Sequence, residues 1–142
     1  MVSQLISLQK AQEIVEAVLA AGRSASLQPL SVAVLDSGGH LLAFAHEDKS
    51  SNMRPQIAMA KASGALALGV SSRKIAEMAV DRAPFINSVA TLLPAGVIPA
   101  AGGVLILNEE KQVIGAVGVT GDTSDNDEQC ALAGIAASGF SA

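Results

Sequence analysis

The sequence predicts an α+β domain built around an antiparallel sheet. Two pairs of apolar runs are each joined by a short turn-like stretch, which is typical of β-hairpins, and hairpins pair antiparallel. Segments with helical periodicity precede, separate and follow these pairs, so the predicted order is helix, hairpin, helices, hairpin, helix. With 142 residues, no internal repeat and no linker, residues 1–142 are predicted to form one domain.

The first predicted helix begins after Ser7, a suitable N-cap, and ends near Gly22. The first hairpin follows Pro29, where "SVAVLD" and "HLLAFAH" flank "SGG", and the glycines supply the positive φ that the turn needs. The apolar residues of the helix recur at the spacing of one face: Leu8, Ala11, Ile14, Val15, Val18 and Leu19.

The second half alternates in the same way. A helix is predicted from Pro55 to about Gly69, followed by shorter helical segments at 73–80 and 84–93. The stretch "PAGVIPAAGG" contains too much proline and glycine for a regular element and is predicted to be a shaped loop. A second hairpin, "VLILNEEKQVIGAVGVTG", turns at 109–111, and the last helix is predicted over 124–138.

Composition excludes several function classes. The formal charge is −4, and the aromatic residues are three phenylalanines without tryptophan or tyrosine, which argues against nucleic-acid binding. One cysteine, Cys130, excludes an intramolecular disulfide and a multi-cysteine metal site, and its helical context favours packing. No signal peptide and no convincing membrane span is found, so we expect a cytoplasmic protein that binds neither membrane nor nucleic acid.

The stretch "GVTGDTSDNDEQC" concentrates four acidic residues where a strand gives way to a helix: Asp122, Asp125, Asp127 and Glu128. Ser124 or Asp125 can cap this helix, and Glu128 stands at capping-box spacing from Asp125. Capping explains two of the four acids. The later glutamate of a calcium loop is missing, whereas a hard-ion site through Asp122 and Asp127 stays an open alternative, and no metal ligand is assigned.

Lys61 is the isolated charge of the opposite sign. It is the sole charged residue from Pro55 through Ser72 and shares a helical stripe with apolar positions. A buried ammonium needs a partner or a ligand, and the alternative is that Lys61 reaches solvent at the rim. Arg54, just before the same helix, adds a second cation. Both can face the acidic cluster, an anionic ligand, or both.

The two histidines, His40 and His46, are both placed on the second predicted strand. Six residues of strand separate them by roughly 20 Å, so they cannot share one ion. Each can act as a lone axial ligand to haem or serve as a surface residue. No Ser–His–Asp order points to nucleophilic catalysis.

Four segments together resemble the GlcG/HbpS-like family, also called haem-degrading-protein-like and related to the C-terminal domain of PduO-type proteins. The resemblance covers nearly the whole chain. It implies an antiparallel five-stranded sheet flanked by helices in a profilin-like three-layer arrangement, and it implies homo-oligomers, some of which bind haem. The segments are "VAVLDSGGHLLAFAHED", "IAMAKASGALALGV", "IPAAGGVLIL" and "VIGAVGVTGDTSDNDEQCALAGIAA".

The resemblance carries over only at matching positions. The chain departs from many relatives at 46–49, where an arginine and "MDGA" are common, and at Asp122, where a glycine is common. The matching positions are Asp36, Gly38, Gly39 and His40 in the first hairpin, Lys61 in the helix, Gly102 and Gly103 in the loop, and Gly118, Gly121, Asp127 and Glu128 near the last helix.

Two function hypotheses of different classes follow. A third possibility is that the protein is a purely structural partner subunit. The first is a domain that binds a small ligand, with haem or another tetrapyrrole as the ligand that the family suggests. The second is an enzyme of small-molecule catabolism, in which Lys61 or Glu128 is the acid/base and Arg54 anchors a carboxylate or phosphate. The small residues of "CALAGIAASG" also predict self-association. The predicted ligand-binding residues are Arg54, His40, Gly102, Gly103, Asp122 and Asp127, in a pocket across which the acids face Arg54 and Lys61.

Overall fold

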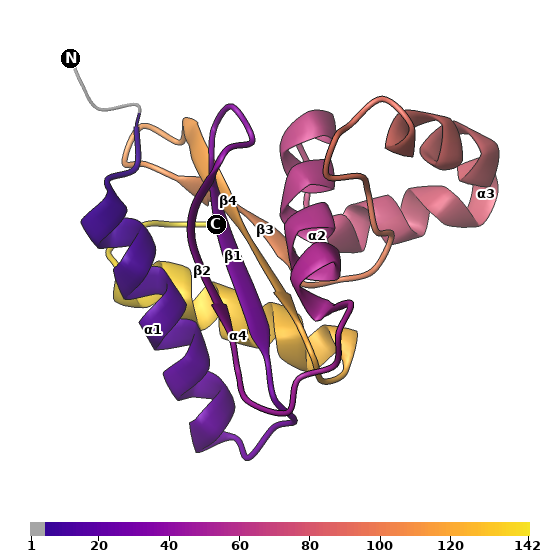
Figure 1. The fold of residues 1–142 in the computed structure, drawn as a ribbon. Coiled ribbons are helices and arrows are strands. Elements are labelled where there is room, and N and C mark those ends of the chain that lie inside the picture. The colour runs from indigo at the N-terminus through magenta and orange to yellow at the C-terminus, as the bar shows by residue number, and fades with distance from the viewer. Residues whose placement is uncertain (1–4) are drawn as a thin grey trace.

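Four helices surround a four-stranded antiparallel sheet in the computed structural model, which describes residues 5–142 (Figure 1). The strand order is β2-β1-β4-β3. The predicted order of elements is confirmed, but the five-stranded sheet is wrong. Within residues 5–142 the chain end adds only an isolated bridge between Leu107 and Ser141. The elements are α1 (Leu8–Ser24), β1 (Ser31–Asp36), β2 (Leu41–His46), α2 (Arg54–Leu68), α3 (Ser72–Ala90), β3 (Gly103–Leu107), β4 (Val113–Thr120) and α4 (Ser124–Ala137).

The helices form two layers, one on each face of the sheet. Helices α1 and α4 pack together on one face, α2 lies across the other, and α3 extends outward beside α2 (Figure 1). Alternate residues of β1 separate the two faces, because Val32 and Val34 enter the core under α1 and α4 whereas Leu35 packs with Ala62 of α2. The three-layer arrangement implied by the family resemblance is therefore present.

The sequence signals at the helix ends agree with the structure in most places. Ser7 caps α1, since its hydroxyl accepts a hydrogen bond from the Lys10 N–H at 3.1 Å. Helix α3 is a single span interrupted at Arg82, where φ and ψ leave the helical region just before Pro84. The two shorter predicted segments are the two halves of this kinked helix.

Glycine allows α2 to lie directly on the sheet backbone. A Cβ added at Gly118 of β4 would lie 1.9 Å from the carbonyl oxygen of Ala58. A Cβ at Gly103 of β3 would lie 2.2 Å from the carbonyl oxygen of Lys61. Any side chain at either position would push α2 outward. This close approach carries Lys61 over the end of β4.

Candidate functional site

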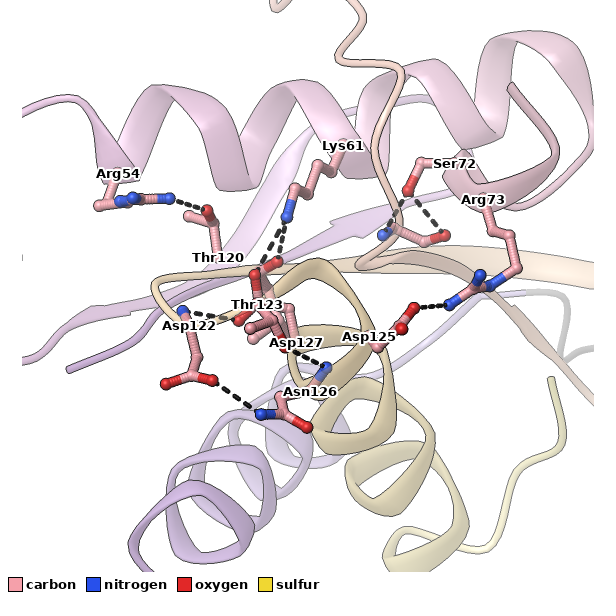
Figure 2. Close-up of polar contacts among 12 residues, drawn as sticks. Arg54, Lys61, Ser72, Arg73, Thr120, Asp122, Thr123, Asp125, Asn126 and Asp127 are labelled. Carbon is pink, nitrogen blue, oxygen red and sulfur yellow. Dashed lines mark hydrogen bonds and ion pairs between the residues drawn. The ribbon is translucent and has the colours of Figure 1, made fainter. Parts of the chain in front are cut away.

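Lys61 is buried in the centre of the molecule and is not at the rim. Its Nζ donates to the carbonyl oxygen of Val119 at 2.9 Å and lies 3.3 Å from Asp127 Oδ2. Lys61 descends from α2 past the end of β4 to reach α4, so the ion pair joins the two helical layers (Figure 2). Of the two readings that the sequence left open, the buried and paired lysine is confirmed.

Asp127 is as deeply buried as its partner. Its Oδ1 accepts a hydrogen bond from the Asp122 backbone N–H at 3.0 Å, while Oδ2 faces Lys61. Both carboxylate oxygens therefore have donors. Asp127 lies in the first turn of α4, where the helix dipole also favours a negative charge.

Burial acts on both partners of the pair against their charged forms. It lowers the pKa of the Lys61 ammonium, against the opposing effect of Asp127, and the nearby Arg54 guanidinium lowers that pKa further. Burial likewise raises the pKa of the Asp127 carboxyl, although the Asp122 N–H and Lys61 oppose this shift. Each charge is thus tolerated only because the other is present.

Gly102 and Gly103 pack around this pair and do not line an open pocket. Gly102 has φ of +130°, and a Cβ there would lie 2.8 Å from Lys61 Nζ. Its carbonyl oxygen accepts from the Val119 N–H at 2.9 Å. Ser72 fixes the neighbouring residue, since its hydroxyl accepts from the Gly103 N–H at 2.7 Å. The glycine-rich loop therefore closes over Lys61 and seals it.

Two other acids of the cluster, Asp125 and Glu128, pair with a residue that the sequence did not single out. Arg73, at the start of α3, contacts Asp125 through its terminal guanidinium nitrogen (Figure 2). Its Nε donates to Glu128 at 3.0 Å. The prediction that the acids face both Arg54 and Lys61 is therefore wrong for Arg54. Glu128 points to the surface pair with Arg73, away from Lys61. No local signal identifies Arg73, because its partners lie more than fifty residues away.

The N-cap of α4 is Thr123. The predicted cap at Ser124 or Asp125 is therefore wrong. The Thr123 hydroxyl accepts from the Asn126 N–H at 3.2 Å. Asp122 stabilises the turn before it by accepting from the Gln28 N–H at 2.9 Å and the Asn126 side chain at 2.8 Å. The Asn126 side chain and the Gln28 N–H lower the pKa of Asp122. Asp122 thus orders the start of α4.

The hard-ion alternative for the acidic cluster gains no support from its geometry. In the part of the chain that the structure describes, no group of three or more His, Cys, Asp and Glu side chains is placed to hold a metal ion. Cys130 is buried in the core between the sheet and α4, and burial raises the pKa of its thiol. Its packing role agrees with the sequence reading.

Arg54 begins α2 and is held by hydroxyl groups. One terminal nitrogen donates to Thr120 Oγ1 at 2.7 Å (Figure 2). The Nε donates to Ser51 Oγ at 3.2 Å. Within residues 5–142 no carboxylate forms an ion pair with it. Its charge is therefore oriented by neutral groups and is not neutralised.

His40 lies at the opposite end of the sheet, one residue before the observed strand β2, so its predicted place on that strand is wrong. Its Nδ1 lies 3.1 Å from Asp36 Oδ1, which also accepts the backbone N–H groups of Gly38 and His40 at 2.9 Å. Burial disfavours the Asp36 carboxylate, but these donors outweigh burial and lower the pKa of Asp36. Because Nδ1 faces a carboxylate, the hydrogen bond leaves Nε2 of the exposed imidazole available.

A pocket of about 390 Å³ lies beside His40 between the β1–β2 turn, α2 and the loop after α3. One wall is apolar, from Leu66, Ala67, Leu93 and Pro94, and the other wall is the turn itself. No acidic residue lines it. Gly38 keeps space for the imidazole, because a Cβ there would lie 3.0 Å from the ring of His40. The complete lining is Ser37, Gly38, Gly39, His40, Ser63, Leu66, Ala67, Leu93, Pro94 and Ala95.

His46, the last residue of β2, has a different environment. Its Nδ1 lies 2.7 Å from Ser31 Oγ, a neutral partner. The depression next to it, of about 490 Å³, is lined partly by Glu47 and Asp48 and opens toward α1. The two histidines therefore lie at opposite ends of β2, as their spacing predicted.

These observations define a three-layer α+β domain with polar groups at both ends of its central sheet. The chain belongs to the family described as haem degrading protein HbpS-like, whose model matches residues 6–136. The comparison with curated proteins gives no significant match. No helix among residues 5–142 is long and apolar enough to cross a membrane.

Solved structures of similar proteins agree with the family assignment. A double mutant of HbpS from Streptomyces reticuli is 26% identical, with a TM-score of 0.82 over 96% of this chain and 88% of that chain. Protein ORFY of Klebsiella pneumoniae is 24% identical, with a TM-score of 0.85 over 97% and 93%. PduOC, solved as a complex with haem, is 18% identical, with a TM-score of 0.84 over 96% of each chain. The last two likenesses show a shared fold.

Proposed function

We propose that this protein binds haem or a related metallated tetrapyrrole in the pocket beside His40. The observation that carries the proposal is the pairing of His40 Nδ1 with Asp36 at 3.1 Å at the edge of an apolar pocket. Histidines that bind metals usually present one ring nitrogen to a carboxylate, which fixes the tautomer and strengthens the other nitrogen as a ligand. Membership of a haem-degrading family and the haem complex of PduOC support the same ligand class.

The residues around the pocket fit a flat, largely apolar ligand. Leu66 and Leu93 provide apolar contacts, and the pocket volume lies within the range of about 300–1,000 Å³ that is usual for small-molecule sites. Bound haem would supply a redox-active iron. His40 would hold the iron through Nε2, and Asp36 would hold His40.

The enzymatic alternative has no comparable support. Lys61, its proposed acid/base, is sealed by Gly102 and already bonded to Val119 and Asp127. A general base must reach the proton that it abstracts. Glu128 is partly covered and paired with Arg73. The geometry favours a structural role for both, and Arg54, which is partly buried, remains the cation of the predicted set without a carboxylate partner among residues 5–142.

Self-association and a cytoplasmic location belong to the same proposal. The small residues of α4 that predicted association are used inside the chain, since a Cβ at Gly134 would lie 2.5 Å from Val18 of α1. We therefore propose that association uses the edge strand β2, where Leu41 and Phe44 are exposed. Sedimentation velocity at micromolar concentration should detect oligomers, and a monomer alone would contradict this. The single, buried Cys130 suits a reducing compartment.

A spectroscopic titration tests the haem proposal. Hemin added to the protein should give a saturable shift of the Soret band at a fixed stoichiometry. The His40→Ala variant should lose that shift, and His46→Ala, which removes the chain's other imidazole, should keep it. A featureless titration that does not saturate, or equal behaviour of wild type and His40→Ala, would overturn the proposal.

A further inference from the structure

The Asp36 carboxylate is held in place by groups that do not neutralise it. Its Oδ1 accepts from the backbone N–H groups of Gly38 and His40 at 2.9 Å and lies 3.1 Å from His40 Nδ1. The two backbone donors are neutral, so they orient the carboxylate and leave its charge. Within residues 5–142, His40 is also the only basic side chain that lies within ion-pair distance of Asp36. The negative charge of Asp36 therefore acts mainly on the imidazole.

The backbone of the β1–β2 turn fixes the geometry of this pair. The Asp36 N–H donates to the His40 carbonyl oxygen at 2.9 Å, and the Gly39 N–H donates to the Asp36 carbonyl oxygen at 3.0 Å. Gly39 has φ of +87°, a conformation that favours glycine. A Cβ at Gly38 would lie 3.0 Å from His40 Nδ1 and 3.4 Å from Asp36 Oδ1, so the absence of a side chain there lets the ring lie against the carboxylate.

The two histidines of the chain differ in the partner of Nδ1. In His46 that nitrogen lies 2.7 Å from the Ser31 hydroxyl, a neutral group, whereas in His40 it faces a carboxylate. A carboxylate behind an imidazole raises the basicity of the other ring nitrogen as a metal ligand. His40 Nε2 is therefore the stronger electron donor of the two imidazoles.

The pocket beside His40 contains no other charge that would offset Asp36. Its lining, as far as the described chain forms it, includes no lysine, arginine, aspartate or glutamate. It also includes no cysteine, methionine or second histidine, the side chains that would compete with His40 for a haem iron. The charge behind His40 is therefore the one that this pocket directs at an iron bound to Nε2.

We propose that Asp36 makes the His40 site selective for ferric over ferrous haem. Ferric iron carries one more positive charge than ferrous iron, so a negative charge held behind its ligand stabilises the ferric form more. Second-shell hydrogen bonding of this kind is one of the means by which a protein sets the reduction potential of haem. The inference rests on the proposed function, because it needs His40 as the iron ligand. Asp36 acts as a positioning residue, and the site retains oxidised haem and releases reduced haem more readily.

An anaerobic redox titration of the hemin-loaded protein tests this selectivity. Asp36→Asn removes the charge but keeps an oxygen that can accept from Nδ1 and from the two backbone N–H groups. We expect the ferric preference to fall by about tenfold or more in this variant, which raises the midpoint potential of the bound haem by about 59 mV for each tenfold. Asp122→Asn removes the same charge from a surface aspartate outside the pocket and should leave the potential unchanged.

Haem transfer to excess apomyoglobin is a second measurement that uses the wild-type protein alone. Ferrous haem should leave at least about tenfold faster than ferric haem, since the Asp36 charge favours retention of the ferric form.

Equal midpoint potentials of wild type and Asp36→Asn, or transfer of ferrous haem no faster than ferric haem, would overturn the selectivity and leave haem binding in place. If Asp36→Asn does not retain hemin, the transfer rates of the wild type decide the question. A Soret shift that does not depend on His40 would overturn the proposed function, and the selectivity with it.

Discussion

Two pairs of a basic side chain with an aspartate differ sharply in accessibility. Lys61 and Asp127 expose 3% and 2% of their side chains, whereas His40 and Asp36 expose 81% and 26%. The Lys61 ammonium is bonded on the protein side and closed by glycine, so nothing reaches it. The His40 imidazole is held at one nitrogen and open at the other. The difference teaches that such a pair marks a ligand site only when one of its donor or acceptor atoms is still open to solvent.

The largest effect should follow from breaking the sealed pair. Asp127→Ala leaves a buried lysine without its counter-charge, and we expect the free energy of unfolding to fall by about 3–5 kcal/mol in urea denaturation. Asp125→Ala, which removes an exposed carboxylate from the same helix turn, is the matched control and should change little.

The double variant Lys61→Met, Asp127→Leu sharpens this test. It removes both charges at once, so most of the lost stability should return, to within about 2 kcal/mol of the wild type. Hemin binding should be retained in the double variant, because neither residue lines the pocket at His40. A folded variant that has lost hemin binding would show that the sealed pair belongs to the ligand site after all.

The open pair should respond in affinity and not in stability. Asp36→Asn removes the negative charge behind His40, and we expect hemin affinity to fall by about 10–100-fold. The midpoint of thermal unfolding should move only slightly, because His40 is largely exposed and the asparagine oxygen can still accept the Gly38 and His40 N–H groups. Asp122→Asn is a suitable control, since Asp122 is another surface aspartate with a lowered pKa but lies outside the pocket. Equal hemin affinity in Asp36→Asn and wild type would contradict the role of Asp36.

A smaller effect is expected at the start of α4. Thr123→Ala removes the observed cap and should lower the free energy of unfolding by about 1 kcal/mol. Ser124→Ala should have almost no effect, because Ser124 is already inside the helix. A larger loss of unfolding free energy in Ser124→Ala than in Thr123→Ala, measured by urea denaturation, would instead support the cap that the sequence predicts.

Lowering the pH should have opposite effects on the stability contributed by the two kinds of aspartate. Asp36 and Asp122 have pKa values below the ordinary 3.8 in the folded state, so their stabilisation is present above pH 3.8 and is lost as the pH falls through the lower folded values. Asp127 has a raised folded pKa, so protonation between that value and 3.8 favours the folded state. The free energy of unfolding, measured from pH 6 to about pH 2.5, should therefore depend less on pH in Asp122→Asn than in wild type. An identical slope would contradict the Asp122 hydrogen bonds.

Local pattern predicted much of the fold because it acts over a few residues. Ser7 and the glycine turn at 38–39 mark element boundaries that the structure reproduces, whereas Pro84 coincides with a kink inside α3. The isolation of Lys61 in an apolar helix left two readings open, and the structure confirms the buried, paired ammonium. The fifth strand came from the family resemblance and not from any local run, and within residues 5–142 the sheet has four.

The errors concern contacts between distant segments. Arg73 has no unusual local context, yet it holds Asp125 and Glu128 because the start of α3 lies near the start of α4. Arg54 was expected to meet the acids, but the register of β4 presents Thr120 to it instead. The sequence shows that four acids lie in one stretch. Which cation each of them contacts depends on how the helices pack in the fold.

The most direct test of the open pair uses the fact that the chain has two histidines. Protein labelled with ¹⁵N at histidine should give signals from only these two imidazoles, which single substitutions assign. On addition of zinc protoporphyrin, a diamagnetic haem analogue that accepts one axial nitrogen, the Nε2 signal of His40 should move to the position of a metal-bound nitrogen, and the signals of His46 should stay. Movement of His46 alone, or of neither imidazole at saturation, would contradict the central claim that His40 is the ligand and its pocket the site.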